Sequence, residues 1–403
     1  MQQFIDVIFG AILGAVLGII LPVIIDQVRQ RLRQRRKDQR NRALNNKDLI
    51  KWLREYHEYH WATHNIPNEL PYCKIGDYRL RIPYLSSPDW DVPLEIEKLH
   101  RINFYSNIDD LLEFAKPSTM NHPVDERLIK ERIAWGLDLW NADSLFLENI
   151  SYRNHHPVFH VTTCDYFAAA TSMFILENET IKAVTKKRYT DCPVRQKYYL
   201  RTEGLANNPF KPITIGCLVV FALRFADGYR VLIQKRSAKN ATSNMVTSVC
   251  PAFGLSPFVG RAPQDTSLLY YNFLREYLEE LHYVKEASKL KKESEIFGGP
   301  KSYYDYLYDL EPARQLRESP HFNLYYIGFG FNLTNGAPNL GLLAKVDDTA
   351  LSQDIYDSIF INWEVDNIRD VKVNSGDLEN LFKSDLMDPA SSFFLERALR
   401  YLE

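Results

Sequence analysis

The chain has 403 residues, of which 45% are hydrophobic, 25% charged and 13% aromatic, and its formal net charge is −2. These proportions are typical of globular proteins and exclude a disordered, collagen-like or disulfide-scaffold protein. The charge is uneven: residues 29–42 hold eight Lys or Arg and one acid, which leaves an excess of nine acids in the rest of the chain. This acidic bulk argues against a protein that coats nucleic acid, so we expect no stable nucleic-acid binding.

The cysteine pattern indicates a cellular compartment and does not indicate a metal or disulfide site. There are five, scattered along the chain and without any Cys-x-x-Cys spacing. Neither a zinc ribbon nor a disulfide framework is indicated, and reduced thiols in a cytosolic compartment are the default interpretation.

The N-terminal segment is the most apolar part of the chain. Residues 7–25 read VIFGAILGAVLGIILPVII without a charge. Nineteen residues at ~1.5 Å each span roughly the hydrocarbon core of a bilayer, so the sequence predicts a transmembrane helix over residues 1–27. A buried core helix or a cleaved signal peptide is the alternative, and the second fits poorly because the positive charges follow the apolar run.

A basic juxtamembrane segment, residues 28–45, follows directly. Its Lys and Arg residues predict a single-pass protein of the inner (cytoplasmic) membrane, with the N-terminus outside and the C-terminal domain in the cytoplasm. Gly10, Gly14 and Gly18 fall four residues apart on one helix face. Small residues at this spacing let membrane helices pack closely, which predicts a homo-oligomer, although glycine is also simply common in membrane helices.

Residues 46–209 read as an α/β region of unknown role. Asp48–Trp61 is predicted to be helical, and Ile108–Phe114 and Asp125–Leu139 are predicted to be amphipathic helices. The stretch His160–Thr171 is rich in small residues; it either lines a ligand cleft or packs a strand against a helix, and packing is the preferred interpretation.

Two histidine groups in this region invite a metal-site interpretation. They comprise His57, His60 and His64, and His155, His156 and His160. Neither group is accompanied by the cysteine or carboxylate pattern of a zinc site, so structural or surface histidines are the preferred interpretation.

Residues 210–403 carry the clearest local signals. Ile213–Phe225 is rich in β-forming residues, Asp227-Gly228 is a hairpin turn, and Tyr229–Arg236 is the predicted return strand. Met245–Cys250 is a further strand candidate, and a helix is predicted from about Ser267.

That helix holds a cluster of acids. Glu276, Glu279 and Glu280 follow Arg275 at spacings of three and four, so all three lie toward one helix face. Carboxylates gathered in this way suit a hard divalent cation, Mg²⁺ or Mn²⁺, which in turn binds substrate phosphates. The alternative is a solvated acidic face paired with Arg275.

The order of these elements resembles the Nudix fold, whose signature is GX5EX7REUXEEXGU. The REUXEE core matches at Arg275, Glu276, Tyr277, Glu279 and Glu280. Arg236 stands at the end of the hairpin strand and Gly254 where the glycine turn begins, and both are assigned to ligand binding. Asn323–Phe331 and Phe360–Val365 look like further strands, and Ser391–Leu402 like a final helix. The predicted fold class is therefore α/β: a transmembrane helix, a mixed α/β cytosolic region, and a Nudix-like α/β/α sandwich over residues 210–403.

The resemblance implies a role for each signature residue. In Nudix proteins the carboxylates at Glu276, Glu279 and Glu280 bind divalent metal and the arginine at Arg275 braces the site, so these four are the catalytic candidates. The chain departs from the signature at three positions. Upstream of the core, Ser267 occupies the glutamate position, with Asp265 the nearest acid, and Arg261 occupies the first glycine position, with Gly260 beside it. Downstream, His282 occupies the position of the terminal glycine. The domain is either a divergent hydrolase or a pocket that binds a nucleotide without cleaving it.

Transmembrane segments joined to Nudix-like domains resemble effectors of CBASS antiphage systems. The resemblance implies a membrane-anchored sensor that binds a nucleotide or cyclic oligonucleotide and acts by clustering its membrane helices. Two alternatives stay open: a tethered Mg²⁺-dependent hydrolase of a nucleoside-diphosphate compound, and a scaffold with a decayed fold.

Overall fold

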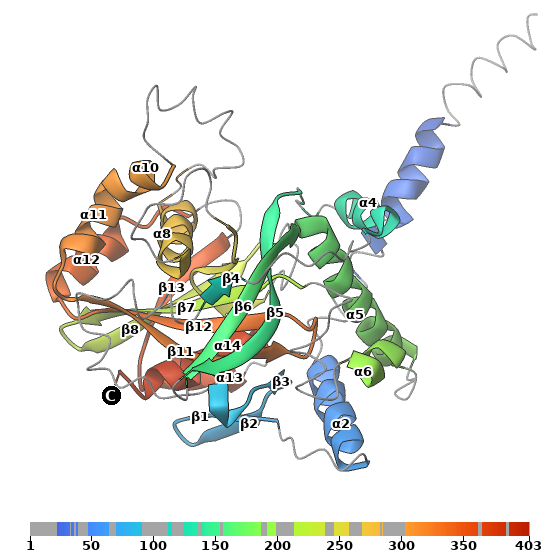
Figure 1. Cartoon of the computed structure of the whole chain (residues 1–403), viewed down its shortest axis with the longest axis horizontal. Helices are drawn as coiled ribbons and strands as arrows, with labels where there is room; N and C mark the ends of the chain where they lie inside the picture. Colours follow the sequence, from blue (N-terminus) through green and yellow to red (C-terminus); the bar gives the residue numbers. More distant parts are fainter. Residues whose placement is uncertain are drawn as a thin grey trace, which may run out of the picture.

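The protein is described here from a computed structural model. The described residues are 22–32, 34–35, 38, 47–63, 70–90, 112–114, 124–135, 137, 139, 141–153, 156–186, 192–198, 213–237, 246–257, 268–282, 284, 303–361, 365–383 and 387–402. Within them the chain is mixed α/β, with helices on both sides of a central sheet (Figure 1).

The first half of the chain contributes short strands, a long hairpin and several helices. Its elements are α2 (Lys47–Thr63), β1 (Tyr72–Ile75), β2 (Tyr78–Arg81), β3 (Tyr84–Leu85), η1 (Pro88–Trp90), β4 (Leu112–Phe114), α4 (Glu126–Ala134), β5 (Asp143–Arg153), β6 (His156–Asp165), α5 (Tyr166–Lys186) and α6 (Pro193–Tyr198). Strands β1 and β2 pair as a hairpin, and β4, β6 and β5 form a three-stranded sheet.

The second half supplies nearly all of the main sheet. Its elements are β7 (Gly216–Phe225), β8 (Gly228–Arg236), β9 (Thr247–Val249), β10 (Ala252–Gly254), α8 (Leu268–Leu281), α10 (Tyr303–Asp309), α11 (Glu311–Glu318), β11 (Phe322–Asn332), β12 (Pro338–Val346), α12 (Thr349–Asp357), β13 (Val365–Lys372), α13 (Gly376–Lys383) and α14 (Pro389–Leu399). Strands run in the order β13-β8-β7-β12-β11-β3, with β9 on β8 and β10 on β7. Strand β12 is parallel to β7 and the other pairs are antiparallel.

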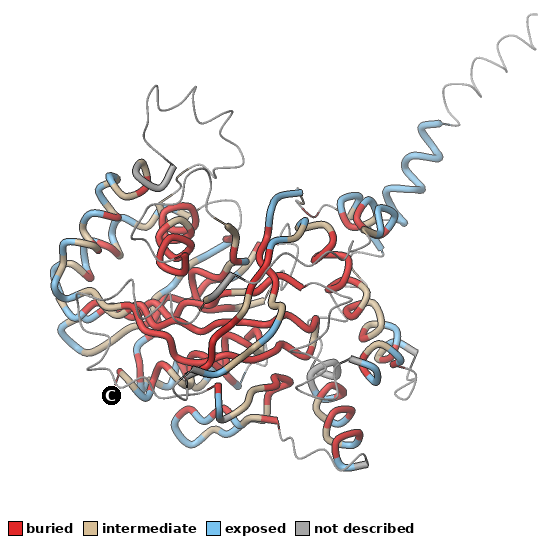
Figure 2. Tube along the Cα trace, in the orientation of Figure 1, coloured by how far each residue is buried: buried red, intermediate tan, exposed pale blue. Residues whose placement is uncertain are grey.

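The sheet has an apolar core on each face because its strands are apolar at successive positions. On β7, Cys217, Val219 and Phe221 belong to the core under α8, and Leu218 and Val220 to the core over α14. Successive side chains of a strand point to opposite faces, so a strand buried on both faces has no polar alternation. Figures 1 and 2 show α8, α10, α11 and α12 on one side of this buried sheet and α13 and α14 on the other.

The first half of the chain closes the far edge of the same sheet. Strand β3 pairs with β11, and Trp90 lies edge-on against Phe329 and Phe331 at centroid distances of 5.3 and 5.7 Å. The Tyr326 hydroxyl donates to the Trp90 carbonyl at 2.9 Å. The hydrophobic core therefore crosses residue 210, where the sequence analysis draws a domain boundary.

Several predicted elements are observed, and two differ in the structure. The hairpin over residues 213–236, the helix over 48–61, the helix from about 267 and the final helix are confirmed with small shifts in their ends. The predicted helix Ile108–Phe114 is wrong where the structure describes it, because β4 pairs in parallel with β6 through Leu112 and Phe114. Of the strand predicted at Phe360–Val365, Phe360 forms only an isolated bridge with His282 and Val365 begins β13, while residues 362–364 lie outside the described residues.

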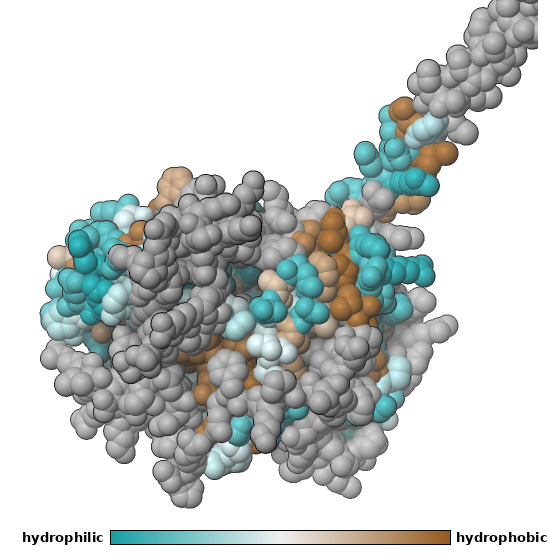
Figure 3. Space-filling model, turned by 45° about the horizontal axis from the view of Figure 1, so that its top comes forward, coloured by the Kyte–Doolittle hydropathy of each residue, from teal (hydrophilic) through white to brown (hydrophobic). Residues whose placement is uncertain are grey.

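The predicted transmembrane helix is not supported. In the part of the chain that the structure describes, no helix combines the length and the apolarity needed to cross a membrane. Residues 22–32 are helical, exposed and charged, with an ion pair of 3.7 Å between Arg29 and Asp26, and they project from the body of the molecule (Figure 3). Charged side chains of this kind are expensive inside a bilayer.

Two predictions change with that finding. The fold class is wrong in its N-terminal membrane helix, and the single-pass localisation in the cytoplasmic membrane, which depends on that helix, is wrong with it. Residues 1–21, which include Gly10, Gly14 and Gly18, lie outside the described residues.

Candidate functional site

The helix that carries the signature, α8, is buried along its whole length. Its sequence has no glycine or proline and an apolar face at helical spacing, which favours a continuous helix. The ring of Tyr277 stacks on Phe221 of β7, with centroids 5.6 Å apart and planes 14° apart. Leu307 of α10 and Leu316 of α11 belong to the same core cluster. All residues of α8 except Arg275 are buried, so the solvated acidic face considered as an alternative is not observed.

The strands below α8 separate at the site. Strands β7 and β8 pair only over residues 222–225 and 228–231. Beyond that point β9 pairs with β8, β10 pairs with β7, and the Val219 N–H donates to the Pro251 carbonyl at 3.0 Å. Residues 250–252 therefore lie where two neighbouring strands have moved apart, and their remaining backbone groups need partners other than a strand.

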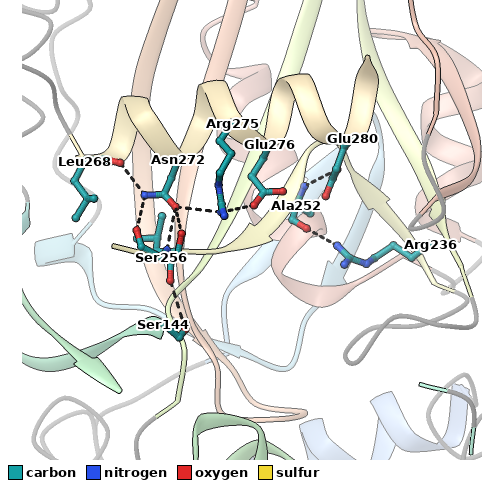
Figure 4. Close-up of polar contacts among 10 residues, drawn as sticks. Ser144, Arg236, Ala252, Ser256, Leu268, Asn272, Arg275, Glu276 and Glu280 are labelled. Atoms are coloured by element: carbon teal, nitrogen blue, oxygen red, sulfur yellow. Dashed lines mark hydrogen bonds and ion pairs between the residues drawn. The ribbon is translucent and has the colours of Figure 1, made fainter. Parts of the chain in front are cut away.

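Two signature residues supply those partners. Oε2 of Glu280 accepts a hydrogen bond from the Ala252 N–H at 3.3 Å, and Nη1 of Arg236 donates to the Ala252 carbonyl at 2.6 Å. Figure 4 shows the two side chains reaching this residue, one from α8 and one from the end of β8. Glu280 thus holds β10 against the helix, and Arg236 holds it against the end of β8.

The other described contacts of the signature form a second, polar group. Arg275 donates to Oε1 of Glu276 and, at 3.4 Å, to Oδ1 of Asn272. Asn272 in turn accepts from the Ser256 N–H at 3.0 Å and donates to the Ser256 and Leu268 carbonyls, each at 2.9 Å. This network fixes the first turns of α8 to the segment after β10 (Figure 4).

The carboxylates lie next to two buried thiols. The Cys250 thiol donates to Oε2 of Glu280 across 3.8 Å. Burial raises the pKa of Cys250 well above its ordinary value, and the charge of Glu280 raises it further. Burial likewise raises the pKa of Cys217, with Glu276 as the nearby charge. Both groups stay protonated at neutral pH and are not nucleophiles.

At least two of the three carboxylates have partners inside the protein. Glu276 pairs with Arg275, Glu280 binds a backbone amide, and Glu279 is buried at 5% exposure. Among the described residues, no three His, Cys, Asp or Glu side chains are grouped so that they could hold a metal ion. One oxygen of Glu276 and one of Glu280 carry these contacts, and the Mg²⁺ or Mn²⁺ site expected from the sequence stays a prediction.

The remaining predicted positions are spread out. Gly254 ends β10 on the surface, and a Cβ there would lie 2.9 Å from Cγ2 of Thr214. His282 follows α8, with its ring 4.7 Å from that of Tyr277. The positions that depart from the signature, Ser267, Asp265, Arg261 and Gly260, lie outside the described residues.

Among the described residues, the histidines of the two groups do not form a metal-binding cluster. His57 is buried with Nε2 3.4 Å from Arg195 Nη1, and His60 is buried on the same helix. His160 on β6 pairs with the Ser151 hydroxyl at 2.7 Å. His64 and His155 lie outside the described residues. The stretch from His160 is the junction at which β6 runs directly into α5.

Three residues that contact the candidate site carry no prediction from the sequence: Ala252, Ser256 and Asn272. Asn272 had a usable signal, since it is a polar residue inside the apolar run Leu268–Leu274 and lies one helical turn before Arg275. Ala252 and Ser256 contribute mainly backbone groups, which leave no signal in the sequence.

Comparison with known proteins gives no family assignment. No protein-family model matches the chain, and no curated protein matches it.

Proposed function

We propose that this protein is a nucleotide sensor, in which a Nudix-like domain formed around α8 binds a nucleotide without hydrolysing it. The observation that carries the proposal is the use of Glu280, which forms a hydrogen bond with the Ala252 N–H inside the protein. In a Nudix-type hydrolase the corresponding carboxylate would serve a metal ion. The resemblance of the element order to the Nudix fold supports nucleotide binding, and the engaged carboxylates argue against turnover.

The departure at Ser267 supports the same conclusion. A divalent-metal site depends on the number of carboxylates that it gathers, because each adds charge and an oxygen ligand. Serine in place of the glutamate at position 267 removes one negative charge and one carboxylate ligand. The ion pair between Glu276 and Arg275 offsets the charge of a second carboxylate. Membrane anchoring and helix clustering have no support among the described residues, where no helix could cross a membrane. An antiphage role that depends on helix clustering lacks support for the same reason.

The test is a thermal-shift panel on the full chain with mononucleotides, dinucleotides and cyclic oligonucleotides, each with Mg²⁺ and with EDTA. A ligand present at about 100 times its Kd stabilises the folded state by about 2.7 kcal/mol, which is a clear rise in melting temperature. We expect at least one nucleotide to raise the melting temperature in EDTA as much as in Mg²⁺. We expect no phosphate or nucleotide product from that ligand after prolonged incubation.

Two variants separate sensing from hydrolysis. Glu279→Gln removes a signature charge while keeping the size of the side chain, and Glu318→Gln, on the exposed surface of α11, is the matched control. A sensor keeps its ligand-induced shift in both variants. Mg²⁺-dependent turnover that Glu279→Gln abolishes and Glu318→Gln leaves intact would establish the hydrolase instead. The absence of any nucleotide-induced shift would refute nucleotide sensing.

A further inference from the structure

The β1–β2 hairpin presents a basic surface on the side of the main sheet away from α8. Its inner side chains, Cys73 and Ile75, are buried in the core around α14, and the Cys73 thiol donates to the Ser392 carbonyl at 3.2 Å. The alternate positions, Tyr72, Lys74 and Arg79, are exposed. Figures 1 and 2 show the hairpin below α14, at the periphery of the body. We call these three residues, with Arg54 of α2, the hairpin face.

Two cations stand directly opposite each other on this face. Lys74 and Arg79 are register partners in the antiparallel pair, so their side chains leave the hairpin on the same side. Like charges in this position destabilise a strand pair. Within the described part of the chain neither residue has an ion-pair partner, whereas Lys130 pairs with Glu126 at 2.8 Å. The chain keeps an unfavourable local arrangement here, and such exceptions mark functional surfaces.

The neighbouring side chains hold these cations in place. The Arg79 guanidinium lies over the Tyr72 ring, 3.8 Å from its centroid. Arg81 is anchored by hydrogen bonds to Glu58 and to the Tyr72 hydroxyl. Arg54 donates from Nη1 to the Arg81 carbonyl at 3.1 Å, which brings a further cation to the end of the hairpin.

We propose that the hairpin face binds the phosphate backbone of a single-stranded nucleic acid. A phosphate between Lys74 and Arg79 would turn their mutual repulsion into attraction, and a guanidinium stacked on a ring still presents its N–H edge to phosphate oxygens. Single strands are favoured over a duplex because Tyr72 lies among the cations, with Arg79 and Arg81 over its ring at 3.8 and 4.7 Å from the centroid, as in single-strand sites that combine positive charge, aromatic rings and arginine cation–π contacts. Four residues per strand span roughly 13 Å, enough for a few nucleotides.

The excess of acidic residues in the rest of the chain limits the affinity that we expect between the hairpin face and a nucleic acid. Net negative charge repels a polyanion at long range, so the contact is local and depends strongly on salt. Arg54, Lys74 and Arg79 are the three cations offered to phosphate. Three contacts on a single strand give a slope of about −2 for the logarithm of the affinity against the logarithm of the salt concentration. Raising the salt from about 50 to about 200 mM should then weaken binding about 20-fold.

The test measures fluorescence anisotropy of a labelled single-stranded RNA with the full chain over this salt range. Lys74→Gln with Arg79→Gln should reduce the salt effect to about 3-fold, because one phosphate contact remains. Lys130→Gln with Arg314→Gln, at exposed positions on α4 and α11, makes the same change in net charge and should leave the salt dependence unchanged. The outcome is independent of whether α8 forms a nucleotide site.

Four results would overturn the proposal: no RNA binding at low salt, a salt effect that the hairpin variant leaves unchanged, equal loss in the control variant, or equal or tighter binding to duplex or to anionic vesicles. The single variant Lys74→Gln should also melt at or above the wild-type temperature, because it removes the like-charge pair and leaves Arg79 on the Tyr72 ring. A clearly lower melting temperature for this variant would contradict the argument from the unfavourable pair.

Discussion

Glu280 accepts a hydrogen bond from the backbone N–H of Ala252 at 3.3 Å, inside the core between α8 and the separated strands β7 and β8. The Glu280 carboxylate therefore accepts the hydrogen bond that a backbone carbonyl of a neighbouring strand would otherwise accept. With Arg236 on the carbonyl of the same residue, both backbone groups of Ala252 are bound by side chains. The site is therefore part of the framework that holds the fold together.

The first prediction concerns this contact. Glu280→Ala should lower the free energy of unfolding by about 1–3 kcal/mol, because it leaves a buried N–H without its partner. Glu280→Gln keeps an oxygen in reach and should cost less than half as much. Urea denaturation of both variants measures the difference, and Glu318→Ala on the surface of α11, expected within about 0.5 kcal/mol of wild type, is the control. Equal losses for Ala and Gln would mean that charge, not the hydrogen bond, is what Glu280 contributes.

The second prediction uses two glycines with different surroundings. A Cβ at Gly341 of β12 would lie 2.1 Å from Cδ1 of the Phe394 ring, whereas one at Gly376, at the start of α13, would meet nothing within 4 Å. Gly341→Ala should destabilise the protein by about 1–3 kcal/mol through overpacking. Gly376→Ala should stabilise it by about 0.4–1 kcal/mol, because the unfolded chain loses freedom.

Thermal unfolding of both glycine variants checks the pair, and a double variant identifies the cause. Phe394→Leu combined with Gly341→Ala should cost less than the sum of the single changes if the ring is what the new methyl group meets. Additive losses would place the strain elsewhere in β12.

The elements that the sequence predicts well are those that local signals determine. The hairpin over residues 213–236 has β-forming runs on both sides of Asp227-Gly228, and Gly228 does adopt a positive φ of 125°. Strand β12 gives no such signal, because it is buried on both faces and its apolar run does not alternate. The local pattern around strand β4 predicts a helix, because the partner strand β6 that determines its structure lies far along the chain.

The candidate site, like the fold, is predictable from the sequence only where local spacing determines it. The spacing of Arg275, Glu276 and Glu280 predicts that they share a helix, and they do. The partner of Glu280 is a backbone amide that reaches it only because β7 and β8 separate, and a contact made by sheet geometry has no sequence pattern. The solvated acidic face considered from spacing alone is replaced by internal contacts for this reason.

The third prediction concerns a buried ion pair between α4 and α5. Nη2 of Arg132 lies 3.1 Å from Oε1 of Glu177, and both side chains are almost fully buried. Glu177→Leu should cost about 3–5 kcal/mol, because the guanidinium is left without its carboxylate in the core. Combining it with Arg132→Met should recover much of the loss, since two apolar residues pack without uncompensated charge. A denaturant series on the two single variants and the double variant measures the coupling, and additive losses would contradict it.

The last prediction is a pH dependence that originates at the end of α8. Burial lowers the pKa of His282 to about 4, and a hydrogen bond with the Ser358 backbone offsets part of this effect. The ordinary pKa is 6.5, so between about pH 6.5 and 4 the unfolded chain binds a proton at this residue that the folded chain does not. Acidification through this range therefore favours the unfolded state, and His282 alone should remove up to about 3 kcal/mol of stability.

His57 acts in the same direction, because burial and the neighbouring Arg195 lower its pKa as well. The His282 contribution must therefore be isolated by difference. His282→Phe keeps a ring against Tyr277 and removes the titrating group. Relative to wild type, this variant should be least stable near pH 7, where it lacks the hydrogen bond of the neutral imidazole, and should gain on wild type as the pH falls. Denaturation curves at several pH values between 4 and 7 give the difference directly. A difference that stays constant across this range would show that His282 titrates alike in the folded and unfolded chains, and that the burial of its ring does not couple stability to pH.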